Sequence, residues 1–233
     1  MHLISVFVSS ISDLIFPNNC LVCEHPVPRN QMVICPFCID ELPYTYFERY
    51  SSSTPFDQLF YGRANVYSTY ALLYFEQHNS TQRVLHALKY DSRKLVGLQM
   101  GIEIGTRLKE KQAIDPIDVL IPVPIHPKKA FDRGYNQSEW IAKGIASVIP
   151  AEIQKNWMVK NHHTKSQTRS NRFNRWDNVS TNFSSRIIDT FEGHIAIVDD
   201  VITTGATIEA MVSAIQAKNK KVKISVITLA ITK

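Results

Sequence analysis

Residues 195–207 read Ile-Ala-Ile-Val-Asp-Asp-Val-Ile-Thr-Thr-Gly-Ala-Thr. The apolar residues at the start of this stretch form a short uninterrupted run, which is typical of a strand buried on both faces of a parallel sheet. The acids Asp199 and Asp200 end that run, and a loop of small residues follows at 203–207. Beyond the loop, apolar residues recur at helical spacing from Ile208 onward. The stretch therefore predicts a buried strand, an acidic pair, a small-residue loop and a helix, in that order.

Each part of this stretch suits a phosphorylated sugar. Ligands bind at the carboxyl ends of parallel strands. A loop of small residues lets backbone N–H groups approach an anion closely, and the helix start behind it favours negative charge. Two carboxylates beside such a loop are suited to accept hydrogen bonds from sugar hydroxyls, or to hold a metal ion near them. Together these features describe a phosphorylated ribose with Mg²⁺; the alternative is an ordinary turn whose acids only cap a helix.

The same stretch resembles the phosphoribosyl-pyrophosphate (PRPP) signature of type I phosphoribosyltransferases at all thirteen positions. The resemblance implies that Asp199 and Asp200 hold the ribose hydroxyls and that the loop holds the 5′-phosphate. The loop residues that it assigns to PRPP are Thr203, Thr204, Gly205, Ala206 and Thr207.

Length and charge set the broad class of the protein. A chain of 233 residues is long enough for one α/β domain with a small appendage, and 44% apolar with 20% charged residues is ordinary for a globular protein. No stretch reaches the ~18 apolar residues that a membrane helix needs, so we expect no membrane insertion. Residues 155–186 hold seven Lys and Arg against one Asp. A polyanion is the natural partner of such a segment; the alternative is a solvated basic loop.

Four cysteines lie close together near the start of the chain, as Cys20-x-x-Cys23 and Cys35-x-x-Cys38. Two such pairs predict a tetrahedral Cys₄ site for structural Zn²⁺. Disulfides are the alternative, although nothing indicates an oxidising compartment, and a redox-active pair is a further one. Zinc would supply folding energy that about fifty residues cannot obtain from a core. We predict a zinc domain over residues 1–50 that begins with a helix at 3–16.

The remaining sequence predicts a linker at 51–62 and a phosphoribosyltransferase-like domain at 63–233. In this domain, strands alternate with helices, which predicts a doubly wound, mostly parallel sheet. The strands are expected at 66–76, 116–121, 157–159, 195–198 and 223–231, and helices at about 80–89, 95–109, 138–149 and after 208.

A second polar loop is expected after the strand at 116–121. Residues 122–127 read Pro-Val-Pro-Ile-His-Pro, which cannot be helical and predicts a rigid turn. Lys128, Lys129 and Arg133 follow it. Two loops that face one crevice could hold the two ends of PRPP, and these cations, with Mg²⁺, are candidates for holding the pyrophosphate. The alternative for the lysines is simple surface charge.

Nearly the whole chain resembles the ComF (ComFC) family of competence-associated phosphoribosyltransferase relatives. This resemblance implies a cytoplasmic protein of natural transformation that acts on or beside incoming single-stranded DNA, and it implies that 160–176 is a loop that closes over PRPP. His162, Ser170 and Lys129 depart from the residues frequent in the family. The shared marks are, in order, the Cys-x-x-Cys pairs after Phe16-Pro17, Leu88-Lys89-Tyr90, 122–126, 133–137, Thr164-x-x-Gln167, Arg175-x-x-Asn178-Val179 with Phe183, and the PRPP signature.

Two functions therefore stay open. One is a competence protein that binds PRPP with Mg²⁺ and single-stranded DNA, with other DNA-uptake or recombination proteins as further partners. The other is an active phosphoribosyltransferase with an unidentified acceptor, for which no general base is obvious. Aromatic residues among the bases of 160–182 favour DNA, because bases stack on rings while cations hold phosphates; the alternative is that the rings anchor the loop. The DNA candidates are Lys165, Arg169, Arg172, Arg175 and Trp176.

Overall fold

A computed structural model describes residues 18–28, 32–90, 93–111, 114–161 and 183–233. The helix expected at 3–16 and most of the basic segment, 162–182, lie outside these residues. Among the helices of the described part, none is long and apolar enough to cross a membrane.

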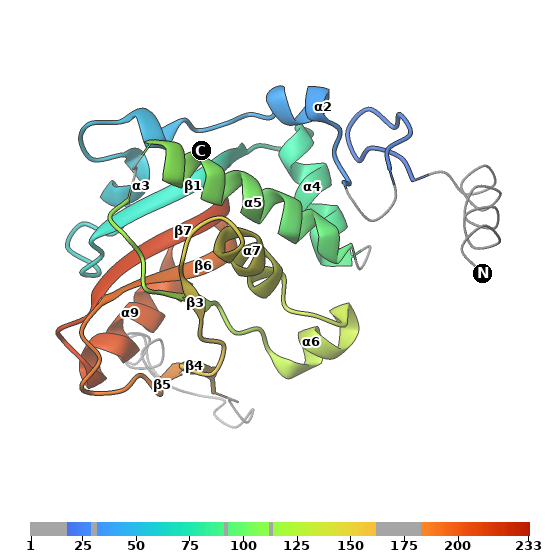
Figure 1. Cartoon of the computed structure of the whole chain (residues 1–233). Coiled ribbons are helices and arrows are strands. Elements are labelled where there is room, and N and C mark those ends of the chain that lie inside the picture. Colours follow the sequence, from blue (N-terminus) through green and yellow to red (C-terminus); the bar gives the residue numbers. More distant parts are fainter. Residues whose placement is uncertain (1–17, 29–31, 91–92, 112–113, 162–182) are drawn as a thin grey trace, which may run out of the picture.

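A five-stranded sheet forms the centre of the molecule (Figure 1). Every pairing in it is parallel, which confirms the predicted α/β class and the mostly parallel sheet. The two central strands are buried almost throughout, as their continuous apolar runs predict. The spatial order of the strands is β1 (Ser68–Phe75), β7 (Lys223–Thr232), β6 (His194–Ile202), β2 (Val119–Pro122) and β3 (Glu152–Ile153).

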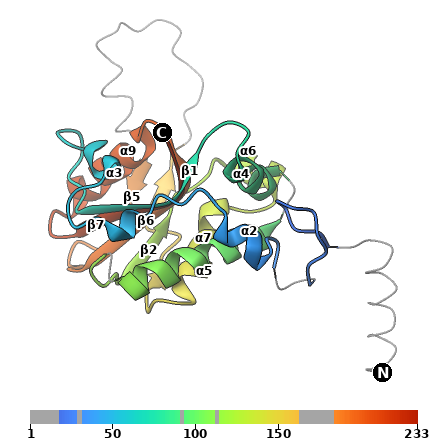
Figure 2. The ribbon, with the colours of Figure 1, turned by 90° about the horizontal axis from the view of Figure 1, so that it is seen from above.

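Helices cover both sides of the sheet. Figure 2 shows α5 (Lys94–Lys111) and α7 (Gln137–Ala146) on one side and α9 (Ala206–Lys218) on the other. Helices α5 and α7 pack closely because glycines meet at their crossing: a Cβ on Gly101 would lie 2.2 Å from the Ile141 carbonyl oxygen. The other helices of the described residues are α2 (Pro36–Asp40), η1 (Phe47–Arg49), α3 (Pro55–Gln58), α4 (Ser80–Tyr90) and α6 (Pro127–Arg133).

A separate two-stranded antiparallel sheet stands apart from the main one. It pairs β4 (Met158–Lys160) with β5 (Phe183–Ser185), and Lys160 lies opposite Phe183. The strand expected at 157–159 is therefore present, but it belongs to this hairpin. The pairing places the strand before residues 162–182 beside the strand after them.

The segment expected as a linker, 51–62, carries helix α3. Thr54 and Asp57 form a capping box at the start of this helix, and Asp57 also accepts a hydrogen bond of 2.8 Å from the Thr69 hydroxyl on β1. Phe56 and Phe60 are fully buried. This segment therefore packs on the main sheet, while the domain boundaries themselves stay a prediction.

Two local predictions are wrong. Strand β6 does not end at the acids but continues through Asp199 and Asp200 to Ile202, because β7 pairs with it along this length. Lys128 and Lys129 are not in a loop: Pro127 begins α6, where its missing N–H costs nothing at the first helical position.

At the amino ends of the strands lies a buried histidine, His194. Its Nδ1–H donates to the Pro116 carbonyl at 2.9 Å, and its Nε2 accepts from the Ser225 hydroxyl at 2.7 Å. Burial lowers the pKa of His194, and Lys223 lowers it further, against the opposing effects of the hydrogen bond to Pro116 and of the acids Asp115 and Asp118. The ring is therefore neutral in the folded protein.

We predict that this histidine makes the protein less stable in mild acid. The unfolded chain takes up a proton at His194 near pH 6.5, whereas the folded chain does so only at lower pH. The stability that neutral His194 contributes is therefore present above pH 6.5 and is lost as the pH falls from there through the lower pKa of the folded chain. Denaturant unfolding between pH 7.5 and 5 should show a smaller slope with pH in His194→Gln than in the natural chain. Equal slopes would contradict this assignment.

Candidate functional site

The small-residue loop connects the end of β6 to α9. Gly205, at the N-cap of α9, has a left-handed backbone with φ +76°, which favours glycine. A Cβ there would also lie 3.0 Å from a ring carbon of Phe60. No side chain caps the start of α9, so backbone N–H groups at the helix start are open to an outside acceptor. A hollow of about 50 Å³ lies beside Asp199 and residues 201–208.

The two acids at the end of β6 have different partners. Asp199 accepts hydrogen bonds from the Ser138 hydroxyl at 3.2 Å and from the Asp200 backbone N–H at 2.9 Å. Asp200 lies 3.1 Å from the Lys89 ammonium, which belongs to the last turn of α4. Burial, and then the neighbouring Asp200, raises the pKa of Asp199 to about 7. Asp199 is therefore incompletely ionised at neutral pH in the unliganded protein, and a bound cation would favour its ionised form.

An arginine that the sequence did not indicate supports the loop from the side. Arg63 donates to the Thr204 carbonyl at 3.0 Å and pairs with Glu209, in the first turn of α9, at 2.8 Å. The pairing offsets a negative charge that would otherwise repel an anion at the helix start. Arg63 follows the segment expected as a linker and belongs to no periodic pattern, so only its position in the fold reveals this role.

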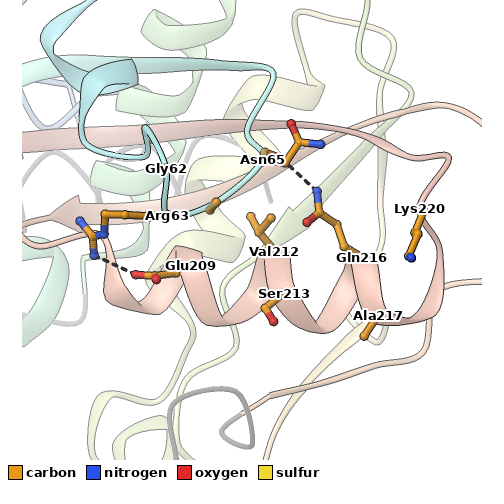
Figure 3. Close-up of a pocket in the computed structure, with 10 residues that line it drawn as sticks. Gly62, Arg63, Asn65, Glu209, Val212, Ser213, Gln216, Ala217 and Lys220 are labelled. Carbon is orange, nitrogen blue, oxygen red and sulfur yellow. Dashed lines mark hydrogen bonds and ion pairs between the residues drawn. The ribbon is translucent and has the colours of Figure 1, made fainter. Parts of the chain in front are cut away.

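Figure 3 shows Arg63 and Glu209 at one end of a groove of about 660 Å³ between residues 62–65 and α9. Further along the groove, the Gln216 side chain donates to the Asn65 carbonyl at 3.2 Å. The groove lies along the outer surface of α9, whose first turn follows the loop.

The second expected loop begins at the same edge of the sheet, because Pro122 at the end of β2 pairs with Val198 of β6. Beyond it, Asn136 caps α7 and also donates to the Val123 carbonyl at 3.0 Å. This fixes the start of α7, where Ser138 contacts Asp199. Ser138 was not among the expected site residues, because a lone serine after a cap has no distinctive pattern.

Of the cations expected in this second loop, the structure describes the side chain of Arg133. Arg133, at the end of α6, donates to the Gln137 side-chain oxygen at 3.0 Å, and its Cζ lies 5.7 Å from the centre of the Tyr90 ring. Among the residues that the structure describes, the buried Nε2 of Gln137 has no hydrogen-bond partner, so it is an unused donor at the start of α7. The side chains of Lys128 and Lys129 lie outside the described part of the structure. The DNA candidates, Lys165, Arg169, Arg172, Arg175 and Trp176, also lie outside it.

The four cysteines come together in one cluster. The sulfur atoms of Cys20, Cys23, Cys35 and Cys38 all lie within 4.8 Å of one another, and those of Cys23 and Cys35 are 3.7 Å apart. A tetrahedral zinc with Zn–S bonds of about 2.3 Å needs sulfurs about 3.8 Å apart. The cluster therefore fits zinc, and the structure supports a zinc-binding N-terminal region.

The thiols of the cluster differ in their electrostatics, because the pKa of Cys20 is lowered whereas burial and the neighbouring cysteines raise the pKa of Cys38. Burial acts to raise the pKa of Cys20, but backbone N–H groups of Cys23, Cys35 and Val22 outweigh it and lower the pKa to about 6. Two of these N–H groups, from Val22 and Cys35, lie 3.4 Å from the Cys20 sulfur. A thiolate is the form that binds metal, so this cysteine is ready to bind at neutral pH.

Side chains of α4 and α5 hold the cluster to the rest of the protein. The Gln99 side chain accepts from the Val33 and Ile34 N–H groups at 2.9 and 3.1 Å, and donates to the Ile34 carbonyl at 2.8 Å. Arg83 donates to the Val22 carbonyl at 2.9 Å. The second cysteine pair is therefore fixed by α5, and the first is tied to α4, the helix that also carries Lys89.

We predict one zinc ion per chain, held by the four cysteines. Elemental analysis of the purified protein should give one equivalent, and Cys38→Ser should lose it, because three thiolates and a weakly binding hydroxyl hold zinc poorly. Removal with a chelator should lower the melting temperature, since zinc supplies folding energy here. The control is Ser53→Ala, an exposed change away from the cluster. A protein with four reactive thiols and no zinc would contradict the assignment.

No family model matches the chain. Competence protein F of Haemophilus influenzae is 29% identical to it over 93 residues, which are 39% of this chain. The match covers 41% of the relative, so the chain spans about two fifths of the length of the curated protein that it matches. This similarity to a Competence protein F supports the resemblance to the ComF family that the order of motifs indicates.

Proposed function

We propose that this protein binds PRPP together with Mg²⁺ at the edge of the sheet formed by the ends of β2 and β6, and that it does so in a competence-associated role. The proposal rests on one observation: the acidic pair in β6 is followed closely by Gly205, whose left-handed backbone begins a helix that no side chain caps. The 5′-phosphate would accept hydrogen bonds from backbone N–H groups at the start of α9. The role in natural transformation follows from the similarity to a Competence protein F.

The acidic pair would serve the ribose. Asp199 and Asp200 present carboxylate oxygens at the end of β6, where they can accept hydrogen bonds from the 2′- and 3′-hydroxyls. Carboxylate oxygens are also the ligands that Mg²⁺ takes up in nucleotide and sugar-phosphate sites. The bound Mg²⁺ would neutralise charge on the pyrophosphate, and Arg133, Lys128 and Lys129 would add to this from α6.

The surroundings of the pair support the same use. Ser138 fixes one oxygen of Asp199 and leaves the rest of the carboxylate for a ligand. Arg63 holds the carbonyl of Thr204, so the loop keeps its shape before the ligand arrives. A preformed site loses less conformational entropy when it binds.

An active transferase is the alternative. It would pass the phosphoribosyl group to an acceptor through an oxocarbenium-like state, from which water must be excluded. Consumption of PRPP and release of pyrophosphate, measured with single-stranded DNA and a panel of bases, separate an enzyme from a binding protein.

We predict that Asp199→Ala with Asp200→Ala abolishes PRPP binding. Each lost hydrogen bond between a carboxylate and a hydroxyl costs ~1.5–3 kcal/mol, so the affinity should fall at least about a hundredfold. Calorimetry with PRPP and Mg²⁺ measures it. The matched control is Asp189→Ala with Glu192→Ala, which removes two largely exposed acids before β6 begins. Unchanged affinity in the first variant would refute the assignment of the acids.

Single-stranded DNA is the second proposed ligand, bound by the basic segment. Residues 155–186 carry a formal charge of +6, from seven bases and one acid, and the β4–β5 hairpin joins the ends of the segment. Such contacts release counterions, so affinity should fall by ~0.7 log units per log unit of salt for each phosphate contact.

We predict that Arg169→Glu with Arg172→Glu flattens this salt dependence by about two contacts. Titration of labelled single-stranded DNA at several salt concentrations measures the slope. Lys220→Glu with Lys221→Glu, two exposed residues after α9, makes the same change of charge elsewhere. If both variants keep the natural slope and affinity, the segment does not hold DNA; a loss of PRPP binding alone would make it a cover for the sugar phosphate.

A further inference from the structure

Lys89 pairs with an acid that the proposed ligand would need. Its ammonium lies 3.1 Å from Asp200, and the two side chains are only 21% and 14% exposed. Within the described part of the chain, Lys89 is the one cation recorded in an ion pair with either acid of the pair. The unliganded site therefore already holds a positive charge where a ligand's hydroxyls or metal would approach Asp200.

The end of α4 holds Lys89 in this place. The carbonyl of Leu88 accepts a hydrogen bond from the buried Tyr135 hydroxyl, which lies just before α7. The next residue, Tyr90, places its ring 4.9 Å from the ring of His86 and close to Arg133. The backbone at Lys89 is therefore fixed, whereas its four-carbon side chain can turn toward another acceptor.

A ligand at Asp200 would leave the Lys89 ammonium without the carboxylate that it now contacts. A partly buried ion pair compensates for lost hydration only while both charges are matched. When hydroxyls or a divalent cation take over Asp200, the Lys89 charge needs a new acceptor. The phosphates of the incoming ligand are the anions that arrive in the same step.

We infer that Lys89 is a counter-ion that moves from Asp200 to a phosphate oxygen of the bound sugar phosphate. The inference rests on the proposed function and assigns a further positioning residue to the same site. It has a consequence that a purely structural lysine lacks. Loss of its charge should strengthen the binding of a bare divalent cation to the acids and weaken the binding of the phosphorylated ligand.

The test compares Lys89→Met with the natural chain in two measurements. The first is Mn²⁺ binding without other ligand, followed by the paramagnetic resonance of free Mn²⁺; the second is calorimetry of PRPP with Mg²⁺. We expect Mn²⁺ to bind Lys89→Met about tenfold more tightly and PRPP about tenfold more weakly, the change expected when one charge a few ångströms away is removed from a partly buried site. Lys89→Arg, which keeps the charge, should return both values toward the natural ones.

Lys94→Met is the matched control, because this exposed lysine at the start of α5 lies over the Tyr135 and Trp140 rings and not beside the acids. It should leave both affinities unchanged. The exchange is overturned if Lys89→Met changes neither affinity or moves both in the same direction. If the natural chain binds no PRPP, the proposed function fails and the exchange fails with it. Normal PRPP binding by both the natural chain and Lys89→Met overturns the exchange alone.

Discussion

The structure depends on the pairing of β6 with a parallel neighbour on each side. The backbone of β6 bonds to β2 and β7, and its side chains from Ile195 to Val198 are fully buried. Because this central strand cannot shift without breaking both ladders, the residues at its end are placed precisely. Asp199 and Asp200 lie in the last part of the strand, where both are half-buried, and Gly205 turns the chain into α9. The same sheet places the end of β2, and through it α7 with Ser138, next to the acids.

The proposed sugar-phosphate site and the cysteine cluster are joined by one helix. Arg83 of α4 donates to the carbonyl of Val22, which lies between the cysteines of the first pair, and Lys89, less than two turns further along, contacts Asp200. Gln99 of α5 fixes the second pair to the same layer. The cluster is therefore packed on the element that completes the site, so loss of metal is expected to loosen α4 as well as the cluster.

Features with strong local patterns could be predicted from the sequence. The buried run before Asp199 predicted a parallel strand, and the spacing of Cys20, Cys23, Cys35 and Cys38 predicted a cluster; the structure has both. Helices α4 and α5 begin and end within two residues of their expected bounds.

Strands β3 and β5 were missed, because two or three residues show no periodicity. The continuation of β6 through polar acids could not be read from apolar runs. The contacts of Arg63 with Thr204 and of Lys89 with Asp200 join segments more than one hundred residues apart, and no local pattern records such a pairing.

The proposed function places a phosphorylated ribose at the end of β6 and the start of α9. A crystal structure of the protein with PRPP and Mg²⁺ tests this most directly. We expect the 5′-phosphate to accept hydrogen bonds from backbone N–H groups of residues 204–207, and the ribose hydroxyls to donate to Asp199 and Asp200. A sugar phosphate bound elsewhere, with the acids and the loop left in contact only with solvent, would contradict it.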